Sequence, residues 1–166
     1  MQPKRYRQLA LFWIAVTGSA ELTAQELSPQ HQRLAFLEGS WTTRSEFPDG
    51  TVAYGDLEYE WVLGGTWMRV EFVGRHPTRS PWEAHVMMRW VPERGEYVSH
   101  VFASPDTPSV FRGRFLDNGV FRVEVPTDDG VAGIDYHPRD GSVYQENWIE
   151  ESGSRRVTLR TTYARH

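Results

Sequence analysis

Residues 57–72 read LEYEWVLGGTWMRVEF, which is two short alternating segments joined by a glycine pair. Acidic or basic residues alternate with bulky apolar ones on both sides of Gly64 and Gly65. Successive side chains of a strand point to opposite faces, so each segment has one polar and one apolar face. A glycine pair supplies the positive φ angles that a tight hairpin needs. The stretch therefore predicts an antiparallel β-hairpin whose apolar face covers a core.

Short strands and glycine turns continue in both directions from this hairpin. The turn signals recur at the spacing of about 8–12 residues that is typical of a barrel or a sandwich. We predict ten strands, at residues 41–47, 54–63, 66–73, 83–91, 96–103, 109–116, 119–125, 131–136, 142–150 and 155–164. Because the connections are short, the expected fold is all-β, an up-and-down antiparallel barrel that removes its edges by closing on itself.

One short helix is predicted before the first strand, over residues 29–37. Ser28 is a suitable N-cap, and Pro29 fits the first helical turn. The helix enters the barrel at the end that carries the tight, even-numbered connections. The longer connections, Gly74–Trp82 and Ser104–Pro108, lie at the other end. We therefore expect the helix to plug one end, with Leu34 and Leu37 packed under the barrel and Trp41 covering its base, and the mouth to lie at the other end.

Two motifs carry a resemblance to known proteins. Residues 37–41, LEGSW, resemble the L-x-G-x-W opening of lipocalin-like (calycin-type) barrels. Residues 59–68, YEWVLGGTWM, resemble the strand–Leu-Gly-Gly–strand hairpin of the bacterial family known as domain of unknown function 1579. The resemblance runs from about Leu34 to Tyr163 and includes the closing residues 161–163. It implies a closed barrel with a plugged base, and it brings no catalytic residue with it.

The first 24 residues predict a signal peptide. Residues 4–7 (KRYR) are basic, residues 9–16 (LALFWIAV) are apolar, and cleavage after Ala20 or Ala24 fits the small residues that follow. The apolar run is far shorter than the ~20 residues of a membrane span. An uncleaved anchor or a surface helix is the alternative. We expect residues 25–166 to form one exported domain, periplasmic or secreted, with no stable membrane insertion after cleavage.

Composition excludes several kinds of chemistry. The chain has no cysteine, which excludes disulfides, thiolate catalysis and thiolate-bound metals. Its only lysine is Lys4, so the mature domain has no Schiff-base chemistry. A net charge of −4 argues against nucleic-acid binding. The histidines show no paired spacing for zinc. Heme would need an axial ligand, for which His85 or His100 could serve, although aromatic-rich walls are more often plain packing.

Two polar residues stand in apolar company and are the candidate site residues. His100 lies between Val98 and Phe102, and Glu146 shares its strand face with aromatic residues. His100 is either a hydrogen-bonded core histidine or a pocket residue. A carboxylate in such surroundings needs a cationic partner, and Arg112 or Arg114 could provide it. The predicted ligand-binding set is His100, Glu146, Arg112, Arg114, Trp148, Phe102 and Trp90. The charged residues of strands 54–63, 66–73 and 83–91 are interpreted instead as a solvated outer face.

The preferred function is binding of a small apolar or amphipathic molecule in the barrel, without a cofactor. The alternative is a cofactor-free enzyme, an isomerase, cyclase or hydrolase, that uses carboxylate, histidine or arginine residues inside the cavity. A third possibility is a filled barrel that interacts with proteins. The volume of the cavity separates the third from the other two, since ligand pockets begin at about 300 Å³.

Overall fold

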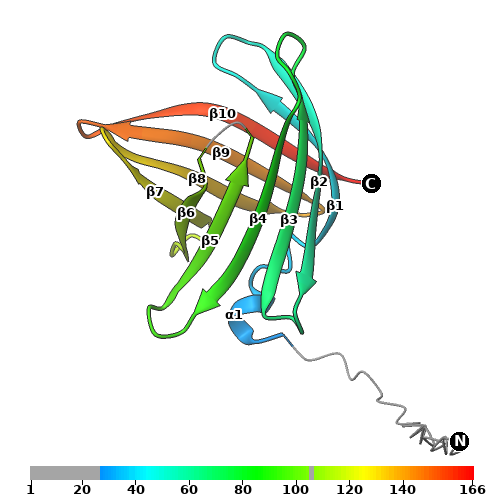
Figure 1. Ribbon diagram of the computed structural model, residues 1–166, viewed down its shortest axis with the longest axis vertical. Coiled ribbons are helices and arrows are strands. Elements are labelled where there is room, and N and C mark those ends of the chain that lie inside the picture. The colour runs from blue at the N-terminus through cyan, green and yellow to red at the C-terminus, as the bar shows by residue number, and fades with distance from the viewer. Residues whose placement is uncertain (1–26, 105–106) are drawn as a thin grey trace, which may run out of the picture.

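The computed structural model describes residues 27–104 and 107–166, which fold into a closed antiparallel barrel (Figure 1). The expected signal peptide, residues 1–24, lies outside the described residues. The strands are β1 (Gly39–Glu46), β2 (Val52–Val62), β3 (Trp67–Arg75), β4 (Trp82–Val91), β5 (Glu96–Ala103), β6 (Ser109–Phe115), β7 (Phe121–Thr127), β8 (Gly130–Arg139), β9 (Ser142–Glu151) and β10 (Ser154–Arg165). Each strand pairs with its neighbours in the sequence, and β1 closes on β10. The predicted fold class and all ten strands are confirmed.

The turns follow from the residues that predicted them. Gly64 and Gly65, between β2 and β3, have φ angles of 70° and 76°, which an L side chain rarely adopts. Leu63 precedes them with a φ of 51°. Three successive residues thus have left-handed backbone conformations, and these reverse the chain direction within the few residues between the two strands. The register that follows pairs Tyr59 with Val70 and Trp61 with Met68.

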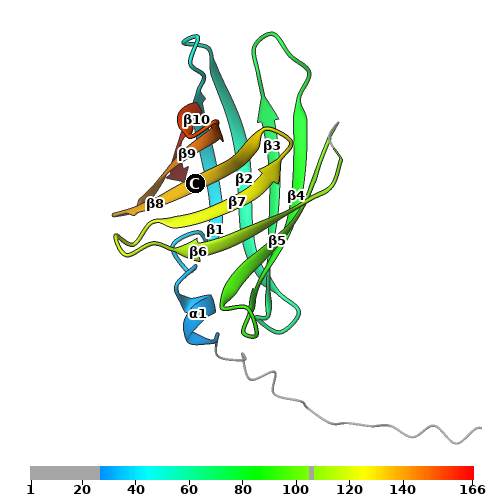
Figure 2. The same cartoon turned by 90° about the vertical axis from the view of Figure 1, so that its left-hand side faces the viewer.

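Strands of the two sides of the barrel cross at a large angle. In Figure 1, β3, β4 and β5 run nearly upright, whereas β8, β9 and β10 run across the view. Figure 2 shows the same crossing from the side, with β6, β7 and β8 lying obliquely against β3 and β4. Such orthogonal packing leaves side chains from both sides facing one interior.

The N-terminal helix is shorter than predicted. The α-helix α1 covers only Pro29–Gln32, capped by the Ser28 side chain, which accepts a hydrogen bond from the His31 backbone N–H. The chain then continues in turns with bonds between residues three apart, such as Leu34 N–H to His31 O at 2.9 Å and Leu37 N–H to Leu34 O at 2.9 Å. Three residues per turn bring Leu34 and Leu37 to the same side, and both are fully buried. The predicted extent of the helix is therefore wrong, but the predicted apolar contact is confirmed.

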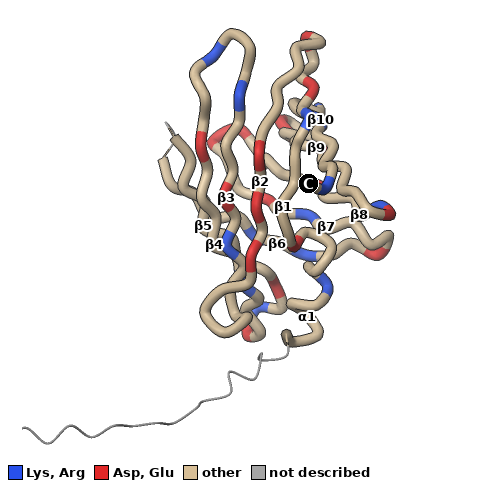
Figure 3. The backbone as a smooth tube through the Cα atoms, turned by 90° about the vertical axis from the view of Figure 1, so that its right-hand side faces the viewer, with Lys and Arg blue, Asp and Glu red and all other residues tan. Residues whose placement is uncertain are grey.

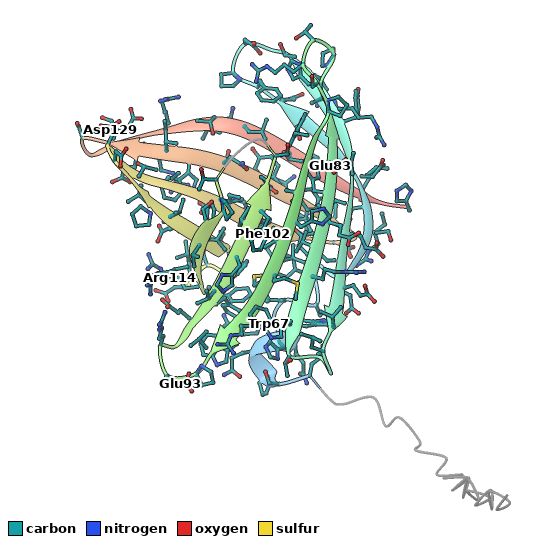
Figure 4. All side chains as sticks on the ribbon, viewed as in Figure 1. Trp67, Glu83, Glu93, Phe102, Arg114 and Asp129 are labelled. Atoms are coloured by element: carbon teal, nitrogen blue, oxygen red, sulfur yellow. The ribbon has the colours of Figure 1, made fainter. Side chains whose placement is uncertain are left out.

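This segment plugs the barrel at the predicted end. The indole N–H of Trp41 donates to Leu37 O at 2.7 Å, and the Tyr97 hydroxyl donates to Gln30 O at 2.7 Å. Figure 4 labels Glu93 on the turn between β4 and β5, at the same end as α1, and Asp129 on the hairpin at the opposite end. We define the plug as residues 28–38. The connections after β1, β3, β7 and β9 lie at the end away from the plug.

Charged residues on β2 and β3 lie outside the barrel, as expected from the strand alternation. Figure 3 shows a run of acidic positions along β2. Asp56 pairs with Arg75 and Glu60 pairs with Arg69, each at 2.5 Å between neighbouring strands. All four side chains are well exposed, so these pairs contribute fractions of a kcal/mol each.

None of the helices in residues 27–104 and 107–166 has the length and apolar character that a transmembrane helix requires.

Candidate functional site

A cavity of about 250 Å³ lies inside the barrel. It extends from Leu37 in the plug to Trp82 at the start of β4, near the opposite end. The indole of Trp82 packs on Phe72, with ring centroids 5.6 Å apart. A Cβ atom on Gly74 would lie only 2.4 Å from the Trp82 indole, which is too close for a side chain at that position. Gly74 therefore allows Trp82 to lie flat against β3 at the upper part of the cavity.

One wall of the cavity is apolar. It comes from β3 to β7, where the inward positions alternate along each strand. Its main members are Val70, Phe72, Val86, Met88, Phe111 and Val123. Ser99 of β5 is the polar exception among them. Apart from Ser99, this wall offers an aromatic and aliphatic surface without hydrogen-bonding side chains.

The facing wall is polar and comes from β1, β10, β9 and β8. The strand register places Thr43 beside Tyr163, and Ser45 beside Thr161. Thr161 in turn lies beside Gln145 of β9. Hydroxyl and amide groups therefore form a continuous surface across neighbouring strands. The lining residues of this wall are Thr43, Ser45, Tyr136, Gln145, Asn147, Thr161 and Tyr163.

Most of these groups satisfy one another. The Ser45 and Thr161 hydroxyls lie 2.9 Å apart. The Tyr163 hydroxyl donates to Gln145 Oε1, and Gln145 Nε2 donates to Asn147 Oδ1 at 2.5 Å. Thr43 differs, because its buried Oγ1 has no hydrogen-bond partner among the described residues. The wall therefore carries two hydrogen-bonded groups, Ser45–Thr161 and Tyr163–Gln145–Asn147, and the free hydroxyl of Thr43.

Three phenols add to this network. Tyr59, Tyr136 and Tyr163 lie close enough for their hydroxyls to interact with one another. Burial raises the pKa of each of the three phenols well above its usual range, because the phenolate would lose its hydration. The phenols are therefore protonated and uncharged at neutral pH.

No charged or histidine side chain belongs to the cavity lining in the part of the chain that the structure describes. A cofactor-free enzyme of the expected kind would need a carboxylate, histidine or arginine facing the substrate. The cavity lining provides none of these groups. His85 and His100, the two histidines considered as heme ligands, alternate with the lining residues Ala84, Val86 and Val101 and so face away from the cavity.

The predicted inward orientation of His100 and Phe102 is wrong. Ser99 and Val101 of β5 line the cavity, so the residues between them lie on the outer face. Phe102 is 49% exposed, and Figure 4 labels it on β5. On the outside of the barrel, His100 lies near Trp67, with ring centroids 6.2 Å apart. Phe102, one of the two apolar neighbours of His100, therefore belongs to the outer surface and not to a pocket.

Glu146, Arg112 and Arg114 also lie outside, and the predicted pairing among them is wrong. Glu146 alternates with the lining residues Gln145 and Asn147. Its carboxylate accepts hydrogen bonds from the Tyr144 hydroxyl at 2.9 Å and from Arg160 Nε at 3.2 Å. The two arginines pair with acidic residues on their own side of the barrel, Arg112 with Glu96 at 2.7 Å and Arg114 with Glu124 at 3.3 Å.

The two predicted tryptophans are on opposite faces. Trp148 is buried, but on the outer side of β9, where its indole N–H donates to Asp135 at 3.1 Å. Trp90 faces inward and packs on Tyr97, with centroids 4.9 Å apart, next to the plug. Trp90 thus belongs to the base of the barrel, below the cavity. A ligand-binding role for the predicted set stays a prediction, since orientation alone does not test it.

The sequence analysis did not predict the polar wall of the cavity. One signal could have found part of it, because Trp41 was expected to cover the base from the inside. Counting by two from Trp41 places Thr43 and Ser45 on the inner face of β1. Gln145 and Asn147 had no comparable signal, since two amides between tyrosine, glutamate and tryptophan look like a solvated face.

An up-and-down barrel with a plugged base and an internal cavity defines a lipocalin-like protein. A family model described as "Protein of unknown function (DUF1579)" matches residues 26–123. The match covers more than half of the chain, and the protein therefore belongs to this family, as the resemblance implied.

Solved structures support the fold. An S-type phycobiliprotein lyase from Guillardia theta is similar with a TM-score of 0.57 and 11% identity. The similarity covers 82% of this chain and 92% of that chain. At this level of identity it is a likeness of fold. Among curated proteins, none matches this chain.

Proposed function

We propose that this protein binds a small apolar or amphipathic molecule inside its barrel. The cavity of about 250 Å³ carries the proposal. Protein interiors normally contain few voids larger than a water molecule. A void of this size between an aromatic wall and a hydroxyl-rich wall is therefore more than a packing defect. The similarity of the barrel to that of the phycobiliprotein lyase is consistent with ligand binding in general.

Filling the cavity tests the proposal. The probe is 2-naphthol, a two-ring molecule whose binding can be followed by calorimetry and by its own fluorescence. Val86 lines the cavity, so Val86→Trp should occupy it and weaken binding at least roughly tenfold, a change of about 1.4 kcal/mol. Val110 lies on the outer face and is 47% exposed. The matched variant Val110→Trp should leave binding unchanged.

Two further observations keep the test decisive. Thermal unfolding of both variants checks that the barrel still forms, and Val101→Phe provides a second, smaller filling of the same cavity. Equal loss of binding in Val86→Trp and Val110→Trp would place the probe elsewhere. If neither 2-naphthol nor other neutral one- or two-ring molecules bind to the wild-type protein, the proposal is wrong.

Export is the second part of the proposal. The order of basic, apolar and small residues over residues 1–24 supports a cleaved signal peptide. In its native host the protein should lose its N-terminus after Ala20 or Ala24 and accumulate in the periplasm or outside the cell. Intact-mass measurement of cell fractions checks this. Full-length chain in the soluble cytoplasm would contradict export but would not affect cavity binding.

The proposed binding needs no resident cofactor. In the described part of the chain, no three His, Cys, Asp or Glu side chains come together as a metal site. Titration of the purified protein with 2-naphthol after exhaustive treatment with a chelator should give the same affinity as before treatment.

A further inference from the structure

Thr43 carries a buried hydroxyl in the cavity wall that could bind a ligand. Thr43 is 3% exposed and lines the cavity from β1. Its Oγ1 has no hydrogen-bond partner among the described residues. A buried hydroxyl without a hydrogen-bond partner destabilises the protein, because it has lost its hydration and gained no bond in return. A bound molecule with a polar group at this position would remove that cost.

The polar and apolar walls meet at Thr43. A Cβ on Gly55, which faces Thr43 across the β1–β2 pair, would lie 2.9 Å from Thr43 Oγ1 and 2.7 Å from the Phe72 ring. The hydroxyl and the ring therefore converge over a residue that has no side chain. A molecule at this junction can touch an aromatic surface and a hydroxyl at the same time.

The charge of the cavity restricts its ligand further. The lining contains hydroxyl, amide and apolar side chains but no charged one among the described residues. Burial keeps the phenols of Tyr59, Tyr136 and Tyr163 protonated by raising the pKa of each. An ionised ligand would lose its hydration without gaining a counter-charge, so its binding is disfavoured. An uncharged ligand avoids this penalty.

The volume limits the size of the ligand. A cavity of about 150 Å³ can hold benzene, and drug-sized ligands occupy about 300–1,000 Å³. The present cavity of about 250 Å³ lies between these values. It matches one or two rings or a short branched chain.

We propose that the cavity selects an uncharged molecule of one- or two-ring size with a hydroxyl, carbonyl or amide group at one end. That polar end bonds to Thr43 beside the Tyr163–Gln145 network, and the apolar body packs on Phe72 and Met88. This inference rests on the proposed binding function and narrows it. The proposed function allows any amphipathic ligand, including a carboxylate. The present inference allows neutral alcohols, ketones and amides and excludes carboxylates.

Three probes that share the naphthalene ring system test the inference on the full chain at pH 7.5. They are 2-naphthol, naphthalene and 2-naphthoate, which differ in having a neutral polar group, no polar group and a negative charge. We expect 2-naphthol to bind several-fold more tightly than naphthalene and at least roughly tenfold more tightly than 2-naphthoate. Binding of 2-naphthoate as tight as that of 2-naphthol would overturn the inference.

A pair of threonine variants tests the role of Thr43. Thr43→Val removes the free hydroxyl with little change in volume, so 2-naphthol should lose its advantage over naphthalene. Thr42→Val is the matched control, because Thr42 lies on the outer face of the same strand and bonds to Ala164 O at 3.3 Å. An unchanged advantage in Thr43→Val would overturn the assigned contact.

The outcomes also separate this inference from the function on which it rests. If no probe binds, the proposed binding function fails. If all three bind equally, cavity binding stands and the selection for a neutral polar ligand is wrong. Should Thr43→Val fail to fold, Thr43→Ala removes the same hydroxyl and repeats the test, and the comparison of the three probes on the wild-type protein still decides the question of charge.

Discussion

Arg155 lies over the ring of Trp148 on the outside of the barrel, with its guanidinium carbon 3.8 Å from the ring centroid. The same guanidinium donates to Asp135 Oδ2 at 2.6 Å. Arg122 donates to both oxygens of this carboxylate, at 2.7 and 2.8 Å. Asp135, Arg122, Arg155 and Trp148, which we term the outer cluster, thus bury a carboxylate on the outer face of the barrel wall.

The outer cluster should make stability depend on acidity. Burial opposes ionisation of Asp135, but hydrogen bonds from Arg122, Arg155 and Trp148 outweigh it and lower the pKa of Asp135 from 3.8 to about 2. The stabilisation is therefore present above pH 3.8 and is lost as the pH falls through about 2. Asp135→Asn should lower the free energy of unfolding by about 2 kcal/mol at pH 7. Urea unfolding at pH 7 and pH 2.5 measures this, and the difference should shrink at the lower pH.

An exposed pair provides the control for that experiment. Asp56→Asn breaks the pair with Arg75, whose side chains are both well exposed, and should cost less than about 1 kcal/mol. Equal losses in the two variants would contradict the special role of the outer cluster.

Gly133 of β8 has no side chain, and the Trp148 ring occupies the space that a side chain would fill. A Cβ at Gly133 would come within 2.3 Å of the Trp148 ring. Gly133→Ala should therefore displace the indole from the sheet and lower the free energy of unfolding by about 1–3 kcal/mol. Chemical denaturation measures the loss, and the near-ultraviolet circular dichroism should change with it. Wild-type stability in Gly133→Ala would mean that Trp148 does not lie flat on β8.

Trp41 joins the plug to the barrel. Its side chain is 1% exposed and its indole N–H bonds to Leu37 O. Trp41→Ala should lower the free energy of unfolding by about 3–5 kcal/mol. Trp41→Phe keeps most of the ring and loses the hydrogen bond, so it should cost about 1–2 kcal/mol. A change within experimental error in Trp41→Ala would show that the plug does not depend on this contact.

His31 should make the plug sensitive to acid. Its Nδ1 lies 3.0 Å from the Ser28 hydroxyl, while its buried Nε2 has no partner among the described residues. Burial lowers the pKa of His31 from 6.5. The unfolded chain therefore takes up a proton that the folded chain resists, and stability falls as the pH drops through 6.5. His31→Asn should reduce this fall between pH 7.5 and pH 5.5, measured by urea unfolding.

His166 offers the matching control, because it is exposed. His166→Asn should leave the dependence on pH as it is in the wild-type protein. If His31→Asn has the same profile as the wild-type protein, the acid sensitivity arises elsewhere.

The sequence predicted the architecture well because turns are encoded locally. Pairs such as Gly64-Gly65 and Asp140-Gly141 need only their own backbone angles to end one strand and begin the next. Closure then follows from short connections and from the cost of open edges. The plug was predicted for a similar reason, since Leu34, Leu37 and Trp41 lie close together in the chain.

The interior was harder to predict, because polarity does not distinguish a polar cavity wall from a solvated face. On β9 the inward residues Gln145 and Asn147 are polar, whereas the outward neighbours include Trp148. On β5 the outward Phe102 is larger and more apolar than the inward Ser99. In both strands the apolar side was interpreted as the inner one, and the alternation was therefore inverted. Only a residue of known orientation, such as Trp41 on β1, fixes the direction of a strand.

The pairing of β1 with β10 has a consequence for how the chain reaches its native state. Among the described strands, this is the one pairing between segments distant in the sequence. The remaining pairs join consecutive hairpins and can form while synthesis is still under way. The seam cannot close until residues 154–165 have left the ribosome, and until then β1 and β9 each present an unpaired edge. A chain that has not yet paired β1 with β10 therefore keeps an unpaired strand edge, and such edges favour aggregation.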